Sequence, residues 1–172
     1  MPNKPEEWLL AEDKSCFAQR VERLEWLISI APAAQIWTFP GGWLGKQLFE
    51  EARYCFVYGQ FLASAILGFA YVERTLAAMF YGAVRNDLQR ATSEGLFQEA
   101  HAAGWLTEQE LGAFDKARRL RNPLVHFRKP GHEDSIEFRG VQEERNLYEI
   151  IEDDAKNILN VVFRLVAQNA VG

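Results

Sequence analysis

Residues 48–84 read LFEEARYCFVYGQFLASAILGFAYVERTLAAMFYGAV, and we interpret them as the longest helix of the chain. Apolar side chains recur three, four and seven residues apart, which is the spacing of one helix face. This stripe consists of Leu62, Ile66, Phe69, Leu76 and Phe80. Residues 54–72 lack formal charge and are nearly long enough to cross a bilayer. Because the polar Gln60 and Ser64 interrupt them, we expect a buried core helix and no membrane span.

An acidic residue, Glu73, falls in the middle of this stripe, seven residues after Ile66 and seven before Phe80. A carboxylate on a core-facing stripe is costly unless it is paired or hydrogen-bonded. Two interpretations follow. Glu73 lies at the edge of the stripe and reaches solvent, or it meets a buried cation that another helix supplies.

The same periodicity predicts further helices around this stretch, at residues 13–30, 93–103 and 147–167. The first should bury one face, formed by Phe17, Val21, Leu24, Leu27 and Ile28. Prolines and glycines mark a connection before residue 48, in which Trp37, Phe39 and Trp43 are expected to pack against the body. Residues 136–139 alternate weakly and are predicted to be extended.

The fold class is therefore all-α, a bundle of four or five helices. We expect one compact domain in which residues 1–47 form an N-terminal helix and an aromatic loop, and residues 48–172 form the bundle. The chain has 172 residues, 48% hydrophobic and 25% charged, which is typical of an ordinary globular domain.

The best-defined helix start lies at Thr107. Thr107 and Glu110 have the spacing of a capping box, and Leu106 and Leu111 have that of a hydrophobic staple. The helix that begins here should direct Leu111, Phe114 and Ala117 towards the core. Arg121 follows seven residues after Phe114, on the same face, so its guanidinium should point inward. It is the obvious candidate partner for Glu73.

Composition restricts the functional classes. The N-terminus is polar and leads into no apolar signal core, so we expect a cytoplasmic protein. Cys16 and Cys55 lack metal-ligand spacing, His101 and His132 are expected at the surface, and no metal or other cofactor is predicted. The net charge of −5 argues against a general coat for nucleic acid or membrane. Any nucleic-acid contact must come from a local patch.

One local patch exists, since residues 116–129 contain six basic residues and no acidic one. They are Lys116, Arg118, Arg119, Arg121, Arg128 and Lys129. The functional interpretation is a polyanion-binding surface. The alternative is a solvated helix face that balances the acidic C-terminal third, because charge runs are usually surface.

Within this patch, Arg121 and His126 lie five positions apart. Arginine is permanently charged and histidine titrates near neutrality, so together they suit a site that acts on a phosphodiester. In an unbroken helix the two side chains would diverge by about 140°. Pro123 predicts a break, in which Asn122 ends one helix and caps the next. Such a break would let Arg121 and His126 converge.

The segment Arg121-Asn122-Pro123-Leu124-Val125-His126 resembles the arginine, polar residue, three others, histidine signature of HEPN domains. The resemblance covers about residues 48–167, where a long helix with an acidic residue precedes the signature. It implies a HEPN-like helical bundle. Many HEPN proteins are metal-independent ribonucleases that act as homodimers, with both signatures lining one cleft.

By this resemblance, His126 would be a general acid or base, Arg121 would stabilise the phosphate charge, and Asn122 would orient the phosphate or the histidine. Glu73 would hold Arg121. RNA would be the substrate, bound by further basic residues: Arg118, Arg119, Arg128 and Lys129. HEPN toxins that are paired with nucleotidyltransferase antitoxins tend to carry a tyrosine two residues after the histidine, where this chain has Arg128.

Three functions remain open at this point. The first is a HEPN-type endoribonuclease, acting as a toxin with an antitoxin or regulatory partner or as a phage-defence effector. The second is a non-catalytic interaction or assembly module in which Arg121 and His126 are structural. The third is a bundle that binds a small ligand or nucleotide.

Overall fold

The computed structural model describes residues 4–33, 36–129 and 131–171 and is mostly helical. The described residues form seven α-helices: α1 (Pro5–Ile30), α2 (Gly42–Val57), α3 (Phe61–Gly82), α4 (Ser93–Ala102), α5 (Glu108–Val125), α6 (Ile136–Gln142) and α7 (Leu147–Gln168). A 3₁₀ helix, η1 (Asn86–Leu88), lies between α3 and α4. Two short strands, β1 (Ile36–Trp37) and β2 (Ala170–Val171), pair antiparallel. The all-α prediction is confirmed, but the expected number of four or five helices is too low for the described residues.

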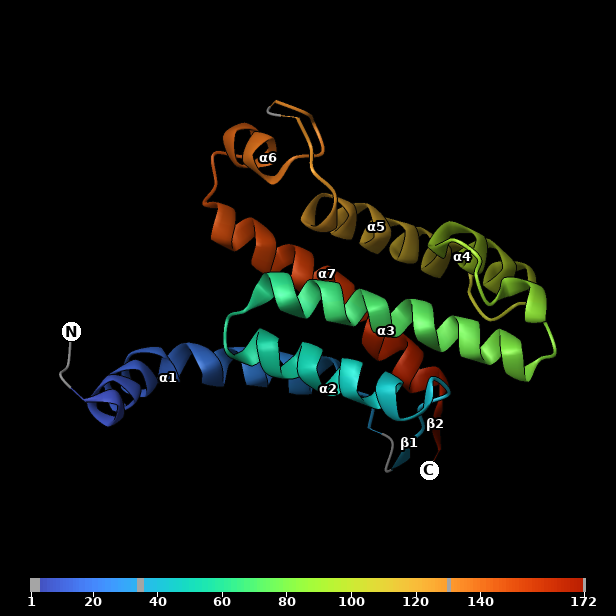
Figure 1. Ribbon diagram of the computed structural model, residues 1–172, viewed down its shortest axis with the longest axis horizontal. Coiled ribbons are helices and arrows are strands. Elements are labelled where there is room, and N and C mark those ends of the chain that lie inside the picture. Colours follow the sequence, from blue (N-terminus) through green and yellow to red (C-terminus); the bar gives the residue numbers. More distant parts are fainter. Residues whose placement is uncertain (1–3, 34–35, 130, 172) are drawn as a thin grey trace.

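Helix α3 is the centre of the bundle. It contacts α2, α4, α5 and α7, and Figure 1 shows α1 and α2 on one side of it and α4 and α5 on the other. Because neighbours cover it from several directions, its buried band is broader than one stripe, and it includes Tyr71, Val72 and Thr75. The predicted stripe is correct from Phe69 onwards, but Leu62 and Ile66 are exposed.

Helix α3 is also long and apolar enough to cross a membrane. Half of its apolar window is buried inside the bundle, as expected for a core helix. The uncharged stretch 54–72 does not form one helix, because α2 ends and α3 begins within it.

A single helix over residues 48–84 was therefore a wrong prediction. The chain reverses between α2 and α3 at Gly59, whose φ is +75°. The carbonyl of Gly59 accepts a hydrogen bond from the Tyr148 hydroxyl (3.0 Å), and Arg23 donates to the carbonyl of Val57 (3.3 Å). Because α2 begins at Gly42, the boundary expected after residue 47 falls inside this helix.

The aromatic connection before α2 packs largely as predicted. The Trp37 ring meets Phe49 edge-on at 5.6 Å between centroids, and the Phe39 ring lies 5.5 Å from the same residue. Trp37 also pairs with Ala170 across the two strands, which ties this connection to the end of α7. Trp43 differs from the prediction, since it projects from the first turn of α2 and is 74% exposed.

The first helix is longer than predicted and is buried on a different face. α1 begins at Pro5, a residue type that suits the first turn of a helix. Of the predicted apolar face, Leu27 alone is buried, and the other four members are exposed. Trp26 and Leu27 attach the C-terminal half of α1 to the bundle, with the Trp26 ring 4.9 Å from that of Phe56.

The extended segment predicted at residues 136–139 is wrong, because these residues lie in α6. Ser135 caps this helix by accepting a hydrogen bond from the N–H of Phe138 (3.2 Å). The helices expected at residues 93–103 and 147–167 are confirmed as α4 and α7. After α4, Gly104 adopts a φ of +74°, as is common for a glycine directly after a helix.

Replacing Gly59 with alanine should lower the free energy of unfolding by about 2 kcal/mol, because a side chain is strained at positive φ. A Cβ atom would also lie 2.5 Å from the Tyr148 hydroxyl oxygen. Urea unfolding followed by circular dichroism measures the effect. The matched control is Gly112→Ala in α5, where a Cβ meets nothing within 4 Å and should raise stability by about 0.5–1 kcal/mol. Equal behaviour of both variants would contradict this account of the turn.

Candidate functional site

The start of α5 sets the position of the candidate site. Thr107 Oγ1 accepts from the N–H of Glu110 (3.2 Å), and Glu110 Oε2 accepts from the N–H of Thr107 (2.8 Å). The predicted capping box is therefore confirmed. Arg164 of α7 forms an ion pair with Glu110, which fixes α5 against α7 as well.

Arg121 and Glu73 form the ion pair that their spacing in the sequence predicts. Arg121 Nη2 lies 3.1 Å from Glu73 Oε1, so α5 is joined to α3. The side chains are 19% and 32% exposed, respectively, which places the pair at the edge of the core. The guanidinium carbon lies 4.6 Å from the centroid of the Phe69 ring. Both interpretations of Glu73 are therefore correct in part, because it lies at the edge of the core and is also paired.

A third helix shares this carboxylate. The hydroxyl of Ser93, at the start of α4, donates a hydrogen bond to the same Glu73 oxygen that binds Arg121. Glu73 thus joins α3, α4 and α5 at one point. The Arg121 Nη1 atom makes only a long contact of 3.5 Å with Asn122 Oδ1.

The helix break predicted at Pro123 is wrong. α5 continues through Pro123 to Val125, and His126 follows with φ −121° and ψ 127°. The N–H of His126 donates to the carbonyl of Asn122 (3.0 Å), so Asn122 lies within the last turn and caps no new helix. A proline removes one helical hydrogen bond, and here this loss falls where the helix is already ending.

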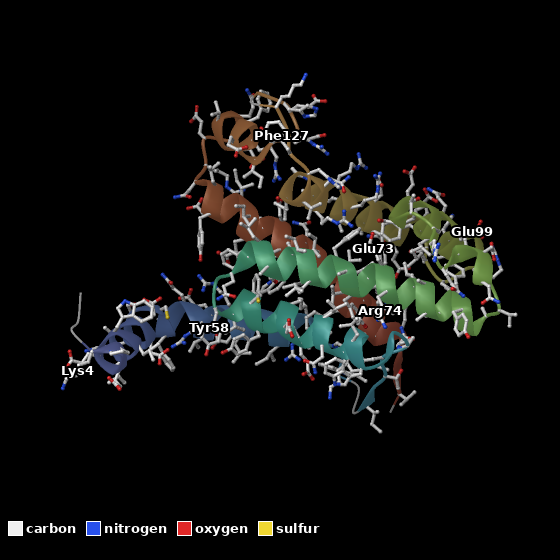
Figure 2. All side chains as sticks on the ribbon, viewed as in Figure 1. Lys4, Tyr58, Glu73, Arg74, Glu99 and Phe127 are labelled. Carbon is white, nitrogen blue, oxygen red and sulfur yellow. The ribbon has the colours of Figure 1, made fainter. Side chains whose placement is uncertain are left out.

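Because α5 is unbroken up to Val125, Arg121 and His126 leave it in different directions. His126 is exposed and lines a cavity of about 520 Å³ between the end of α5 and the start of α6. Arg128 and Glu137 line the same cavity, and Arg121 does not. Figure 2 shows Phe127, the neighbour of His126, beside α6, whereas Glu73 lies near the middle of α3. The predicted convergence is not found within one chain.

The wall of this cavity opposite α5 is held by an ion pair that the sequence analysis missed. Arg139 of α6 donates to both carboxylate oxygens of Asp154 in α7, at 2.7 and 3.0 Å. Asp154 is 1% exposed. Burial raises the pKa of the Asp154 carboxyl, and the adjacent Arg139 opposes this change. The sequence did contain a signal, because Asp154 stands four residues from both Ile150 and Ile158 on the buried face of α7.

The basic segment is less positive than its sequence suggests. Asp115, directly before it, forms ion pairs with Arg118 (2.6 Å) and Arg119 (2.7 Å). Lys116 donates a hydrogen bond to Asn157 (2.7 Å). The part of the segment farthest from Asp115 in sequence adjoins His126. There Lys129 is exposed, and the buried Nε of Arg128 has no hydrogen-bond partner among the described residues.

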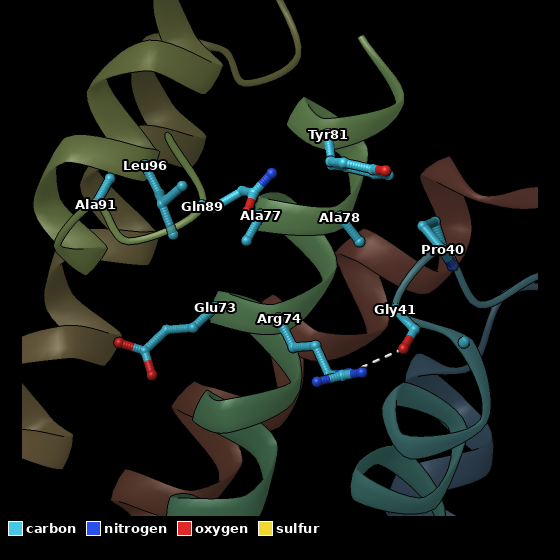
Figure 3. Close-up of a pocket in the computed structure, with 11 residues that line it drawn as sticks. Pro40, Gly41, Glu73, Arg74, Ala77, Ala78, Tyr81, Gln89, Ala91 and Leu96 are labelled. Carbon is cyan, nitrogen blue, oxygen red and sulfur yellow. Dashed lines mark hydrogen bonds between the residues drawn. The ribbon is translucent and has the colours of Figure 1, made fainter. Parts of the chain in front are cut away.

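A second cavity of about 740 Å³ lies on the other side of Glu73, between α3, the start of α2 and the start of α4. Figure 3 shows that the side chains of Glu73 and Arg74 point to opposite sides of α3. The Nε of Arg74 donates to the carbonyl of Gly41 (2.8 Å), and Tyr81 and Gln89 also line this cavity.

The remaining candidate ligands lie apart from one another. Within residues 4–33, 36–129 and 131–171, no group of three or more His, Cys, Asp or Glu side chains could hold a metal ion. His132 is exposed, as predicted. His101 is partly buried, and its Nδ1 lies 2.9 Å from the carbonyl oxygen of Leu106, so it belongs to the α4–α5 connection. Cys16 and Cys55 are free, partly buried thiols.

No model of a protein family matches the chain, and the searches of curated proteins and of solved structures likewise found no match.

Replacing Arg121 with alanine should lower the free energy of unfolding by about 1–2 kcal/mol, because Glu73 keeps a partly buried charge with Ser93 as its remaining partner. Chemical unfolding of Arg121→Ala, Glu73→Ala and the double variant measures the coupling between the two side chains. A coupling of about 1 kcal/mol is expected for such a contact. The control is Arg119→Ala, since the Arg119 side chain is 71% exposed and should contribute less than about 0.5 kcal/mol. Additive single effects would contradict the pairing.

Replacing Arg139 with alanine should destabilise the fold by about 3 kcal/mol at pH 7, because the buried Asp154 carboxylate loses its ion-pair partner. The native state of this variant should bind a proton at Asp154 more tightly than the unfolded chain does. Its deficit relative to the wild type should therefore shrink as the pH falls through the raised pKa of Asp154 and return as the pH rises. Urea unfolding measures both effects at about pH 4.5, near the usual carboxyl pKa range, and at about pH 7, well above it.

The control for this prediction is Arg145→Ala. Arg145 lies just before α7 and pairs with Glu143 and Asp153, whose carboxylates are exposed. Its effect should remain below about 1 kcal/mol at either pH. A deficit of Arg139→Ala that does not change with pH would show that Asp154 stays charged in the variant.

Proposed function

We propose that this chain is a metal-independent endoribonuclease of the HEPN type, acting as a toxin or phage-defence effector. The observation that carries the proposal is that Arg121 is positioned by its contacts and His126 is accessible to solvent. Arg121 is held in place by Glu73 and lies over Phe69, while His126 is exposed five residues later beside Arg128 and Lys129. A positioned cation and an accessible imidazole are the groups that this reaction needs.

The reaction uses the RNA itself as the nucleophile. His126 as a neutral base removes the proton of a ribose 2′-hydroxyl, and the resulting oxygen attacks the adjacent phosphorus. The bond to the 5′ oxygen breaks, and that oxygen takes a proton from a water molecule, while the proton held by His126 passes to the hydroxide that remains. The products are a 2′,3′-cyclic phosphate and a 5′-hydroxyl. Arg121 stabilises the negative charge that builds up on the phosphate oxygens, and Asn122 orients the phosphate.

One chain supplies one imidazole, and its Arg121 points away from the His126 cavity. We therefore place the complete site between two chains, with Arg121 from one and His126 from the other. Lys129, Arg128 and the exposed Arg119 would bind flanking phosphates. Asp115 pairs with both Arg118 and Arg119, and Arg118 contributes less because its side chain is only 25% exposed, against 71% for Arg119.

A non-catalytic interaction module is the second candidate function. It is favoured by the contacts of Arg121, whose guanidinium is already engaged by Glu73, Phe69 and, at longer range, Asn122. In this case Arg121 serves the fold, and the protein has no nuclease activity.

Purified protein should cleave single-stranded RNA in the presence of EDTA and leave cyclic phosphate ends. His126→Ala should reduce the rate by at least about 100-fold, as expected for loss of a general acid or base. The control is His132→Ala, which removes another exposed histidine six residues away and should leave the rate unchanged. Gel analysis of labelled RNA measures the rate, and circular dichroism confirms the fold. Cleavage that survives in His126→Ala would exclude the assigned role.

The same assay tests whether the site is shared between chains. Neither Arg121→Ala nor His126→Ala should cleave RNA alone. After the two variants are mixed and allowed to exchange subunits, about a quarter of the wild-type activity should return, because half of the dimers are mixed and one of their two sites is intact. No recovery in a mixture that has exchanged would place both residues in one chain.

A further inference from the structure

Helix α1 carries a second apolar face that no described part of the chain covers. Five large side chains on it are between 37% and 70% exposed: Leu10, Phe17, Val21, Leu24 and Ile28. At 100° per residue they fall within an arc of about 60°, so they form one continuous stripe. We call these five residues the α1 stripe.

The α1 stripe is distinct from the side of α1 that packs on the bundle. Leu27 is buried in the core, and Arg23 donates to the carbonyl of Val57 and lies over the ring of Phe61. Leu27 lies about 100° and Arg23 about 140° around the helix from the middle of the stripe. Figure 1 shows the N-terminal half of α1 extending past the end of α2, so the stripe continues beyond the bundle. An exposed apolar surface of this length marks an interaction site.

We propose that the α1 stripe binds the α1 stripe of a second copy of this chain in an antiparallel pair. With Lys14 included, the stripe positions are 10, 14, 17, 21, 24 and 28, which alternate four and three residues apart as in a coiled-coil seam. This set is symmetric about residue 19. In an antiparallel pair Leu10 therefore faces Ile28, and Phe17 faces Val21, each twice. Such self-matching is what a two-fold interface requires.

The charges of α1 favour this partner and orientation. A parallel pair in register would place Lys14 against Lys14, whereas the antiparallel pair places it against Leu24, along which its aliphatic stem can lie. α1 also carries six acidic residues against three basic ones, so an anionic lipid surface would repel it. A second copy is thus the better occupant than a membrane.

The antiparallel pair also determines how the two bundles, and with them the two candidate sites, lie relative to each other. The two-fold axis keeps both bundles on the same side of the plane that contains the two helices, because each bundle lies about 100–140° from its stripe and so off the line between the helices. Each bundle then turns the same end towards the other. This is the end with the α2–α3 turn, α6 and the start of α7, from which α1 projects in Figure 1. The exposed side chains of Tyr58, directly after α2, Leu62 of α3 and Tyr148 of α7 lie near this end.

His126 lies at this end too, next to α6. The docking of α1 would therefore bring the motif regions of two chains face to face. This last step rests on the proposed function, whereas the docking itself does not.

Sedimentation velocity of the full chain at micromolar concentration tests the inference. The wild type should have twice the chain mass of 19.7 kDa. Phe17→Glu and Val21→Lys should each be monomeric, because each buries a charge against an apolar side chain. The double variant F17E/V21K should dimerise again, since Glu at 17 then faces Lys at 21 of the other chain. The control Gln19→Glu adds the same charge on the opposite side of α1 and should stay dimeric.

Each result has a defined meaning. A dimer that persists in Phe17→Glu overturns the inference, and a double variant that stays monomeric overturns the antiparallel orientation. A monomeric wild type that binds phosphatidylcholine or phosphatidylserine vesicles through Phe17 would assign the stripe to a membrane. The inference stands if the wild type dimerises through the stripe but cleaves no RNA, in which case the proposed function alone fails.

Discussion

The arrangement of the bundle depends on how the Glu73 carboxylate is neutralised. This group stands on the central helix, and leaving it unpaired at the edge of the core would cost more than its partners cost to order. Arg121 and Ser93 both bind one of its oxygens, which places α5 and the start of α4 relative to α3. Since the pair is partly exposed, it contributes more to the choice of one arrangement than to total stability.

The position of His126 follows from that contact. α5 is continuous from its capping box to Val125, so the ion pair at Arg121 also fixes where the helix ends. On the other side of the His126 cavity, Asp154 plays the corresponding part by holding α6 through Arg139. The Arg121–Glu73 pair joins residues 48 positions apart and fixes α5, whereas the Arg139–Asp154 pair joins the neighbouring helices α6 and α7.

The parts of the structure that could be predicted are those that neighbouring residues decide. Thr107 and Glu110 predict the start of α5. The pairing of Arg121 with Glu73 was predicted because each residue stands seven positions from an apolar residue on its own helix. The turn at Gly59 could not be found in this way, because helical periodicity continues on both sides of it. What fixes the turn is Tyr148, 89 residues further along the chain.

The errors near the candidate site have similar causes. A proline usually ends a helix, yet Pro123 is tolerated because α5 ends two residues later, at Val125, and few hydrogen bonds remain to be lost. The extended segment expected at residues 136–139 is helical because Ser135 caps it and Arg139 binds a buried carboxylate in α7. Of the site residues, the sequence therefore placed Glu73 and Arg121 together but misjudged the direction of His126.

An unbroken α5 changes what a working site would require. Arg121 is held against Glu73 of α3, whereas His126 lines the cavity beside α6, so a phosphate bound in that cavity lies away from the Arg121 of the same chain. A second chain removes this constraint, provided that something aligns the two copies. The α1 stripe has the symmetry and the exposed apolar surface to do so, and it projects from the end of the bundle that carries His126. A two-fold dimer would then account both for the exposed α1 stripe and for the separation of Arg121 from His126 within one chain.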